Sequence, residues 1–113
     1  MKVAVVGSRL LNVPDLQKYL PHQLTEIVSG GAAGVDRCAR EYAQQNQIPL
    51  TEFLPQYDRY RRAAPIKRNE QLVAYADCVI AFWDGQSKGT LSSIQYALRA
   101  HKELHVYILE PNL

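Results

Sequence analysis

Short apolar runs alternate with segments of helical periodicity along this chain. The first run, at residues 3–6, is apolar at every position, which is typical of a strand covered on both faces of a sheet. Pro49 and Pro55 limit the third run, because proline cannot donate to a strand ladder. The pattern predicts strands at residues 3–6, 25–29, 48–54, 78–83 and 104–109.

The segments between these runs have the spacing of amphipathic helices. Residues 34–45 give the clearest pattern, with apolar side chains at i, i+3, i+4, i+7 and i+8. Residues 12–20 predict a short helix, with Asn12 as its cap and Asp15 completing a capping box. Pro65 suits the first turn of a helix over 65–75, and 55–64 reads as an irregular loop. A last helix is expected over 90–100, with one face formed by Ile94, Ala97, Leu98 and His101.

This alternation of strands and helices predicts one α/β domain over residues 1–113. Strands that alternate with helices form a mostly parallel sheet with helices on both faces. Right-handed crossovers then favour a Rossmann-like, doubly wound order, 3-2-1-4-5, with the switch point between the first and fourth strands.

Composition narrows the classes of function. The chain is 47% hydrophobic and 21% charged, as in ordinary soluble globular domains. Thirteen basic and 11 acidic residues leave a net charge of +2, which argues against an obligate nucleic-acid binder. Cys38 and Cys78 lack CxxC spacing and are expected to be buried thiols of a reducing compartment. No apolar run approaches the roughly 18–20 residues of a membrane span or forms a leader, so we expect no membrane association and a cytoplasmic location.

Three glycine-bearing loops follow predicted strands and carry the strongest functional signal. They lie at residues 7–9, 30–34 and 85–90. In an open α/β sheet such loops meet at the carboxyl ends of the strands, where ligands bind. Glycine lets backbone N–H groups approach a phosphate, and the start of the next helix favours negative charge. The sequence therefore predicts a phosphorylated small-molecule ligand, a nucleotide or a nucleotide derivative, with no other cofactor implied.

The loop at 30–34 admits more than one interpretation. It matches neither G-x-G-x-x-G nor the P-loop pattern, and tight packing at the strand–helix corner is the alternative to ligand contact. Asp36 follows the loop, and its carboxylate could cap the helix or accept a ribose hydroxyl; both roles stay open.

The remaining candidates add donors for a phosphate. Ser8 and Arg9 are of the types that bind phosphate, and Arg68 and Asn69 project from a helix. Lys88 could supply a counter-charge, and Trp83 could pack on a ligand or on the rim of the sheet. The full predicted ligand-binding set is Gly7, Ser8, Arg9, Gly30, Gly31, Ala32, Gly34, Asp36, Arg68, Asn69, Trp83, Asp84, Gly85, Ser87, Lys88, Gly89 and Thr90.

Residues 57–69 interleave tyrosines with basic side chains. This pattern suits single-stranded nucleic acid, a flap over one nucleotide or a solvated loop. The residues that would contact a nucleic acid are Tyr57, Arg59, Tyr60, Arg61, Arg62 and Lys67. The three histidines show no metal-ligand spacing with other donors, so no metal site is expected.

Taken together, the glycine loops, Arg68-Asn69 and the stretch Asp84–Thr90 resemble the SLOG superfamily. That group joins the Lonely Guy nucleoside-monophosphate phosphoribohydrolases, DNA-processing protein A (Smf) and nucleotide-sensing domains. The resemblance covers almost the whole chain and is nearest to small stand-alone bacterial and phage members of unassigned function. It implies a Rossmann-like fold, a nucleotide ligand and self-association into a homo-oligomer.

One departure bears on catalysis. The hydrolase branch resembles P-G-G-x-G-T-x-x-E in its last loop, and Ser93 stands here at the glutamate position. A serine cannot act as a carboxylate base, and only Asp36 and Asp84 are available as weak substitutes. Three functions remain open: nucleotide binding or sensing without strong catalysis, hydrolysis of a nucleotide N-glycoside, and single-stranded DNA binding.

Overall fold

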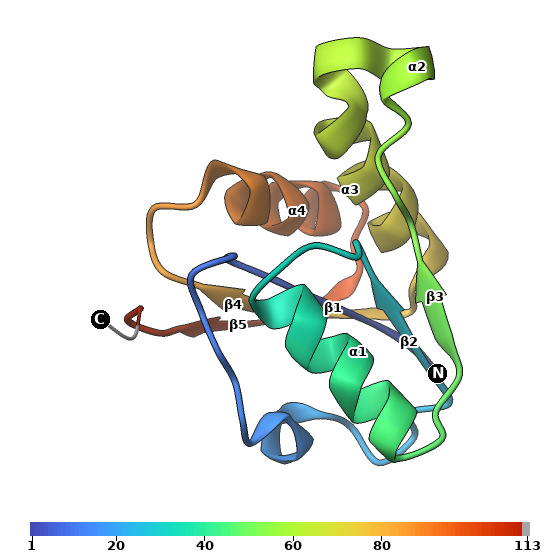
Figure 1. Cartoon of the computed structure of the whole chain (residues 1–113), viewed down its shortest axis with the longest axis vertical. Helices are drawn as coiled ribbons and strands as arrows, with labels where there is room; N and C mark the ends of the chain where they lie inside the picture. Colours follow the sequence, from blue (N-terminus) through green and yellow to red (C-terminus); the bar gives the residue numbers. More distant parts are fainter. Residues whose placement is uncertain (112–113) are drawn as a thin grey trace.

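A five-stranded parallel sheet organises the chain. The computed structural model describes residues 1–111, and the strand order is β3-β2-β1-β4-β5, as predicted (Figure 1). Every neighbouring pair of strands is parallel. The strands are β1 (Lys2–Gly7), β2 (Glu26–Ser29), β3 (Leu50–Glu52), β4 (Cys78–Trp83) and β5 (Glu103–Ile108).

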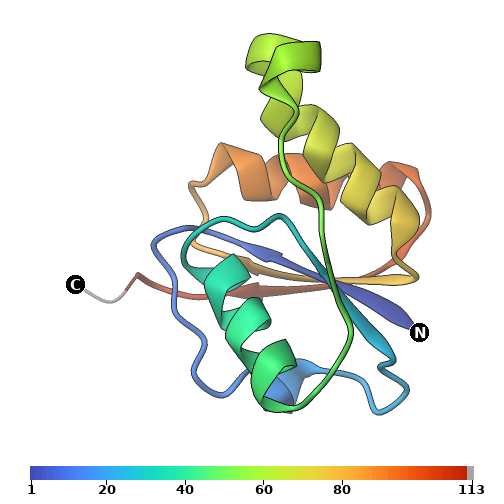
Figure 2. The same cartoon turned by 45° about the vertical axis from the view of Figure 1, so that its right-hand side comes forward.

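Helices cover both faces of this sheet. Helix α1 (Val35–Gln45) lies on one face with the 3-10 turn η1 (Leu16–Tyr19), and α3 (Ala64–Tyr75) and α4 (Lys88–Arg99) lie on the other (Figure 2). Each layer has its own apolar core. Val35, Ala39 and Ala43 pack on the α1 face, as their spacing predicts, and Leu72, Val73 and Ala97 pack on the α3/α4 face. The predicted doubly wound α/β fold is confirmed.

The predicted helix over 12–20 is wrong except for the four residues of η1. Asp15 makes no capping bond, and Asn12 instead accepts a hydrogen bond from the Cys38 thiol, 3.0 Å from Oδ1 to Sγ. Pro14 explains the difference, because proline disfavours helical conformation in the residue before it. The segment is held against α1 by buried Leu11, Val13 and Leu16. Cys38 is only half-buried, so the expectation of a buried thiol is wrong for this residue, whereas Cys78 is fully buried; both thiols are free.

The segment 55–64 is also more regular than expected. It forms a single helical turn, α2 (Tyr57–Tyr60), and a 3-10 turn, η2 (Arg61–Ala63), before α3 begins at Ala64. These turns project beyond the body of the domain at the top of Figure 1. None of the helices within residues 1–111 is long and apolar enough to cross a membrane.

Helix α4 is rotated relative to its predicted face. Leu98 is 60% exposed and His101 is exposed, so these two assignments are wrong. The buried stripe is Thr90, Ser93, Ile94 and Ala97, at i, i+3, i+4 and i+7. The polar end of this stripe, Thr90 and Ser93, is thereby placed at the carboxyl end of the sheet.

Candidate functional site

A cavity of about 490 Å³ lies at the carboxyl ends of β1, β2 and β4. Its wall comes from the loops after these strands and from the start of α4 and one face of α3. This is the switch point of the sheet, where open α/β folds bind ligands. The lining residues are Val6, Gly7, Ser8, Arg9, Leu10, Gly30, Ala32, Asp36, Pro65, Arg68, Asn69, Leu72, Asp84, Gln86, Ser87, Gly89, Thr90 and Ser93.

Most of the predicted ligand-binding residues lie in this wall, although they come from four separate parts of the chain. Those that the structure brings together are Gly7, Ser8, Arg9, Gly30, Ala32, Asp36, Arg68, Asn69, Asp84, Ser87, Gly89 and Thr90. The other predicted residues, which are not part of the cavity wall, are Gly31, Gly34, Trp83, Gly85 and Lys88.

These five residues contact other parts of the chain, form turns or face solvent. The Trp83 indole donates to the Ser87 carbonyl at 3.0 Å and braces the turn before α4. The Gly31 carbonyl accepts from the Arg40 guanidinium, which also pairs with Glu52 at 2.9 Å. Gly34 and Gly85 have positive φ angles of 68° and 80°, and Lys88 is exposed.

Sequence reasoning missed several lining residues that helical spacing could have found. Pro65 and Leu72 lie three residues before and four after Arg68 on the same face of α3. Ser93 lies one turn after Thr90 in α4. Val6, Leu10 and Gln86 complete the wall. The only sequence signal that could have predicted them is that they adjoin or lie within the glycine loops.

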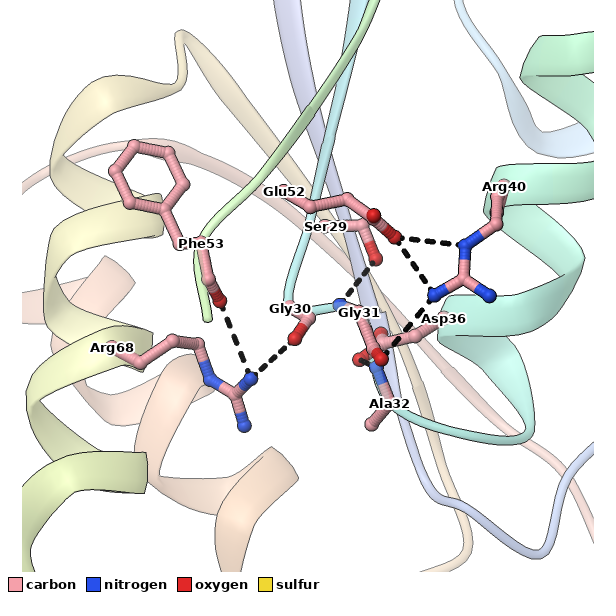
Figure 3. A network of polar contacts seen from close by, with 9 residues as sticks. All are labelled: Ser29, Gly30, Gly31, Ala32, Asp36, Arg40, Glu52, Phe53 and Arg68. Carbon is pink, nitrogen blue, oxygen red and sulfur yellow. Dashed lines mark hydrogen bonds and ion pairs between the residues drawn. The ribbon is translucent and has the colours of Figure 1, made fainter. Parts of the chain in front are cut away.

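Arg68 is a buried cation of the cavity wall that several hydrogen bonds hold in place. It is 8% exposed, and its Nε donates to the Asn69 side chain at 2.9 Å. Its Nη1 donates to the carbonyl oxygens of Gly30 and, at 3.4 Å, of Phe53 (Figure 3). The remaining nitrogen, Nη2, has no hydrogen-bond partner among residues 1–111, so it is free for a ligand.

Asn69 extends this arrangement to α4. Its side-chain amide donates to the Gly89 carbonyl at 3.3 Å. Hydrogen bonds therefore connect Arg68 through Asn69 to the start of α4.

Asp36 stands on the opposite side of Gly30 from Arg68 (Figure 3). It is 7% exposed, and burial raises the pKa of its carboxyl above the ordinary value. The backbone N–H of Ala32, at 3.0 Å, and the positive charge of Arg68 oppose this rise. Burial in turn lowers the pKa of Arg68, the charge of Asp36 raises it, and nearby Arg9 lowers it.

Two N–H groups of the glycine loop after β2 are satisfied by neighbouring side chains. Gly31 N–H donates to the Ser29 hydroxyl at 3.4 Å, and Ala32 N–H donates to Asp36. The anion that this loop holds is thus its own carboxylate. A phosphate there would have to compete with Asp36, which also disfavours it by charge.

The start of α4 is better suited to an external anion. Asp84 accepts from the N–H groups of Gln86 and Ser87 at 2.9 and 2.8 Å, which lowers the pKa of its carboxyl. The Ser87 hydroxyl then caps the helix by accepting from Thr90 N–H at 3.3 Å. The first N–H groups of a helix have no intrahelical partner, and a Cβ built on Gly89 would meet nothing within 4 Å. Open space therefore adjoins the positive end of α4.

The basic segment of 57–69 lies mainly outside the cavity. Arg59, Arg61 and Arg62 are exposed, and Lys67 pairs with Glu70 at 3.8 Å. Tyr57 is exposed and is not part of the cavity wall, whereas Pro65, Arg68 and Asn69 at the other end of the segment line it. The nucleic-acid and flap interpretations of the segment both remain predictions.

No protein-family model matches this chain, and no curated protein matches it either. The resemblance to the SLOG superfamily therefore stays a prediction from motifs.

Proposed function

We propose that the cavity binds a nucleotide or nucleotide derivative and that the protein acts as a binding or sensing domain without strong catalysis. One observation carries this proposal: a buried arginine with one uncommitted nitrogen, an exposed arginine and the positive end of α4 meet around a single cavity. Guanidinium groups and helix N-termini are the usual protein ligands of phosphate.

Size and charge support the same class of ligand. A volume of about 490 Å³ lies in the range of roughly 300–1,000 Å³ typical of small-molecule sites. Two positive side chains, Arg9 and Arg68, face two carboxylates, of which Asp84 is already committed to backbone N–H groups. Asp36 keeps acceptor capacity after its bond to Ala32, which suits a ribose hydroxyl.

The test is a thermal-shift screen against nucleoside mono-, di- and triphosphates, dinucleotides and cyclic nucleotides, followed by calorimetry on each hit. Ligand at about 100 times its dissociation constant adds about 2.7 kcal/mol to stability, a shift of several degrees at this size. Arg68→Ala should weaken a phosphorylated ligand by about 1.5–3 kcal/mol, the strength of a hydrogen bond to a charged group.

Because Arg68 also holds two backbone carbonyls, its variant needs a companion that leaves the fold alone. Arg9→Ala serves this purpose, since Arg9 is exposed and lines the same cavity. Arg99→Ala removes an equal charge at the far end of α4 and should leave affinity unchanged. No shift with any compound, or equal losses in Arg9→Ala and Arg99→Ala, would contradict the proposal.

A second candidate function is hydrolysis of the ligand's N-glycosidic bond. It is favoured by Asp36, a cavity carboxyl whose pKa is raised by burial, as in general acids. Release of free base from a nucleotide that binds, abolished in Asp36→Asn, would support hydrolysis. Binding without any base release by a concentrated preparation would leave the sensing role.

We further propose that the domain belongs to the SLOG superfamily, acts in the cytoplasm and self-associates. The edge strand β5 supports self-association, because Val106 and Ile108 are 39% and 70% exposed on it. Light scattering after size exclusion measures the assembly. A monomer at all accessible concentrations would contradict self-association without affecting the nucleotide site.

A further inference from the structure

A second group of chemically active side chains lies at the other end of the sheet. Cys78 and Glu103 are direct partners in the register of β4 and β5, and His105 lies two residues along β5. Because strand side chains alternate between faces, all three project from the same face. Cys78 Sγ lies 3.3 Å from Glu103 Oε2, and His105 Nε2 lies 3.0 Å from the same oxygen.

These three side chains also border a shared space. A cavity of about 200 Å³ is lined by them together with Tyr19, Leu20, Pro21, Ile80 and Tyr107. The thiol is buried, whereas the Glu103 and His105 side chains are 53% and 50% exposed. The group is thus anchored on its inner side and open to solvent on its outer side, so a small ion has a path to it.

We propose that Cys78, Glu103 and His105 bind a divalent transition-metal ion, with Zn²⁺ as the preferred ion. Thiolate, imidazole and carboxylate are all ligands of zinc, and a thiolate with an imidazole excludes Mg²⁺ and Ca²⁺ as the favoured ions. With three protein ligands, the fourth position of a tetrahedral ion is left for water or another small ligand.

The distances fit this assignment. With a Zn–S bond of about 2.3 Å and Zn–N and Zn–O bonds of about 2.1 Å, tetrahedral ligand atoms lie about 3.4–3.6 Å apart. The observed separations of 3.3 and 3.0 Å are slightly shorter, and all three ligand atoms lie within 4.8 Å of one another. Small side-chain rotations of the two exposed residues would therefore complete the site without moving the strands.

The thiol must lose its proton to the solvent as the sulfur–metal bond forms. Without metal, the buried Cys78 thiol donates its proton to the Glu103 carboxylate, 3.3 Å away. The same negative carboxylate that disfavours a bare thiolate favours a divalent cation between the two groups. Binding one ion therefore releases one proton from Cys78, and affinity should rise with pH.

Sequence spacing did not reveal this site. Glu103 and His105 are only two residues apart, but the third ligand, Cys78, lies 25 residues before Glu103, and no sequence pattern joins it to them. The parallel pairing of β4 with β5 creates the group, so it is visible only once the register is known.

Titration of the reduced full chain with Co²⁺ tests the proposal, because thiolate coordination gives an intense ligand-to-metal absorption and tetrahedral geometry gives strong visible bands. We expect one ion bound per chain and displacement of cobalt by Zn²⁺. Cys78→Ser should lose the thiolate band, and Cys38→Ser, the matched control, should keep it. His105→Ala, whose position is exposed and should tolerate the change, should bind at least about 10-fold more weakly.

Absence of a thiolate band in the wild-type protein would overturn the proposal. So would a band that persists in Cys78→Ser or disappears in Cys38→Ser. Circular dichroism of each variant separates loss of the ion from loss of the fold. None of these outcomes depends on the nucleotide cavity, because the metal group lies at the amino ends of β4 and β5.

Discussion

Arg68 lies directly against Gly30, and a side chain at position 30 would prevent this contact. Nη1 of Arg68 donates to the Gly30 carbonyl, and a Cβ built on Gly30 would stand 2.7 Å from that nitrogen. The same Cβ would stand 3.1 Å from the Asp36 carboxylate. The missing side chain of Gly30 therefore lets a buried cation and a buried anion approach the same backbone unit.

Gly30→Ala should displace the Arg68 guanidinium and weaken phosphate-bearing ligands. Overpacking of this kind costs about 1–3 kcal/mol of stability, and the end of the arginine can move, so we expect the lower half of that range. Gly89→Ala is the control for stability only, because its Cβ would meet nothing within 4 Å but Gly89 lines the same cavity. Denaturant titrations compare the stability of the two variants, and calorimetry compares the ligand affinity of Gly30→Ala with that of the wild type. Equal stability of the two variants, or an unchanged affinity in Gly30→Ala, would contradict this role of Gly30.

Gly34→Ala should destabilise the fold far more than Gly30→Ala does. Gly34 has φ 68°, and its Cβ would lie 2.5 Å from the carbonyl oxygens of Ser8 and Arg9, which cannot yield as a side chain can. Strain and overpacking together should cost more than about 3 kcal/mol. Gly85→Ala, at φ 80° but in open space, isolates the strain and should cost about 1–2 kcal/mol. The prediction fails if unfolding experiments find Gly34→Ala and Gly30→Ala equally stable.

Asp36 should make stability decrease as pH rises. Its folded-state pKa lies above the ordinary value of 3.8, so the folded protein binds more protons than the unfolded chain between these two values. The free energy of unfolding should therefore fall as pH rises from 3.8 through the folded pKa.

Asp36→Asn isolates this effect from the other acidic groups. As pH rises from 3.8 through the folded-state pKa of Asp36, the free energy of unfolding of the wild type should fall relative to that of Asp36→Asn. Carboxyl NMR should also place the midpoint of Asp36 above 3.8, and higher still in Arg68→Ala, where the stabilising positive charge is absent. A midpoint below 3.8, or a midpoint that falls in Arg68→Ala, would contradict the assigned causes.

The basic segment allows a direct test of nucleic-acid binding. If Arg59, Arg61 and Arg62 contact a single strand, binding of mixed-sequence oligonucleotides should weaken steeply with salt, and the triple alanine variant should flatten that dependence. Arg37→Ala, an exposed arginine of α1, provides the charge control. No mobility shift at low salt would exclude the nucleic-acid role and leave the segment as a flap or a solvated arm.

Local pattern was a good guide to the sheet and a poorer guide to the turns. Continuous apolar runs indicate buried strands, and β4 was predicted with its observed bounds. The segment over 12–20 failed because Pro14 and contacts with α1 outweigh its helical spacing. The short turns α2 and η2 lack an apolar period of their own, so composition suggested only a loop.

The sequence by itself determined the α/β class, the strand order and the loops that reach the carboxyl edge of the sheet, because these depend on periodicity, on glycine positions and on the handedness of crossovers. Only the tertiary structure decided which groups meet. Burial shifts the pKa values of Arg68 and Asp36, the Ala32 N–H donates to the Asp36 carboxylate, and register joins Cys78 to Glu103. Such contacts depend on distances between residues far apart in the chain, which no local pattern encodes.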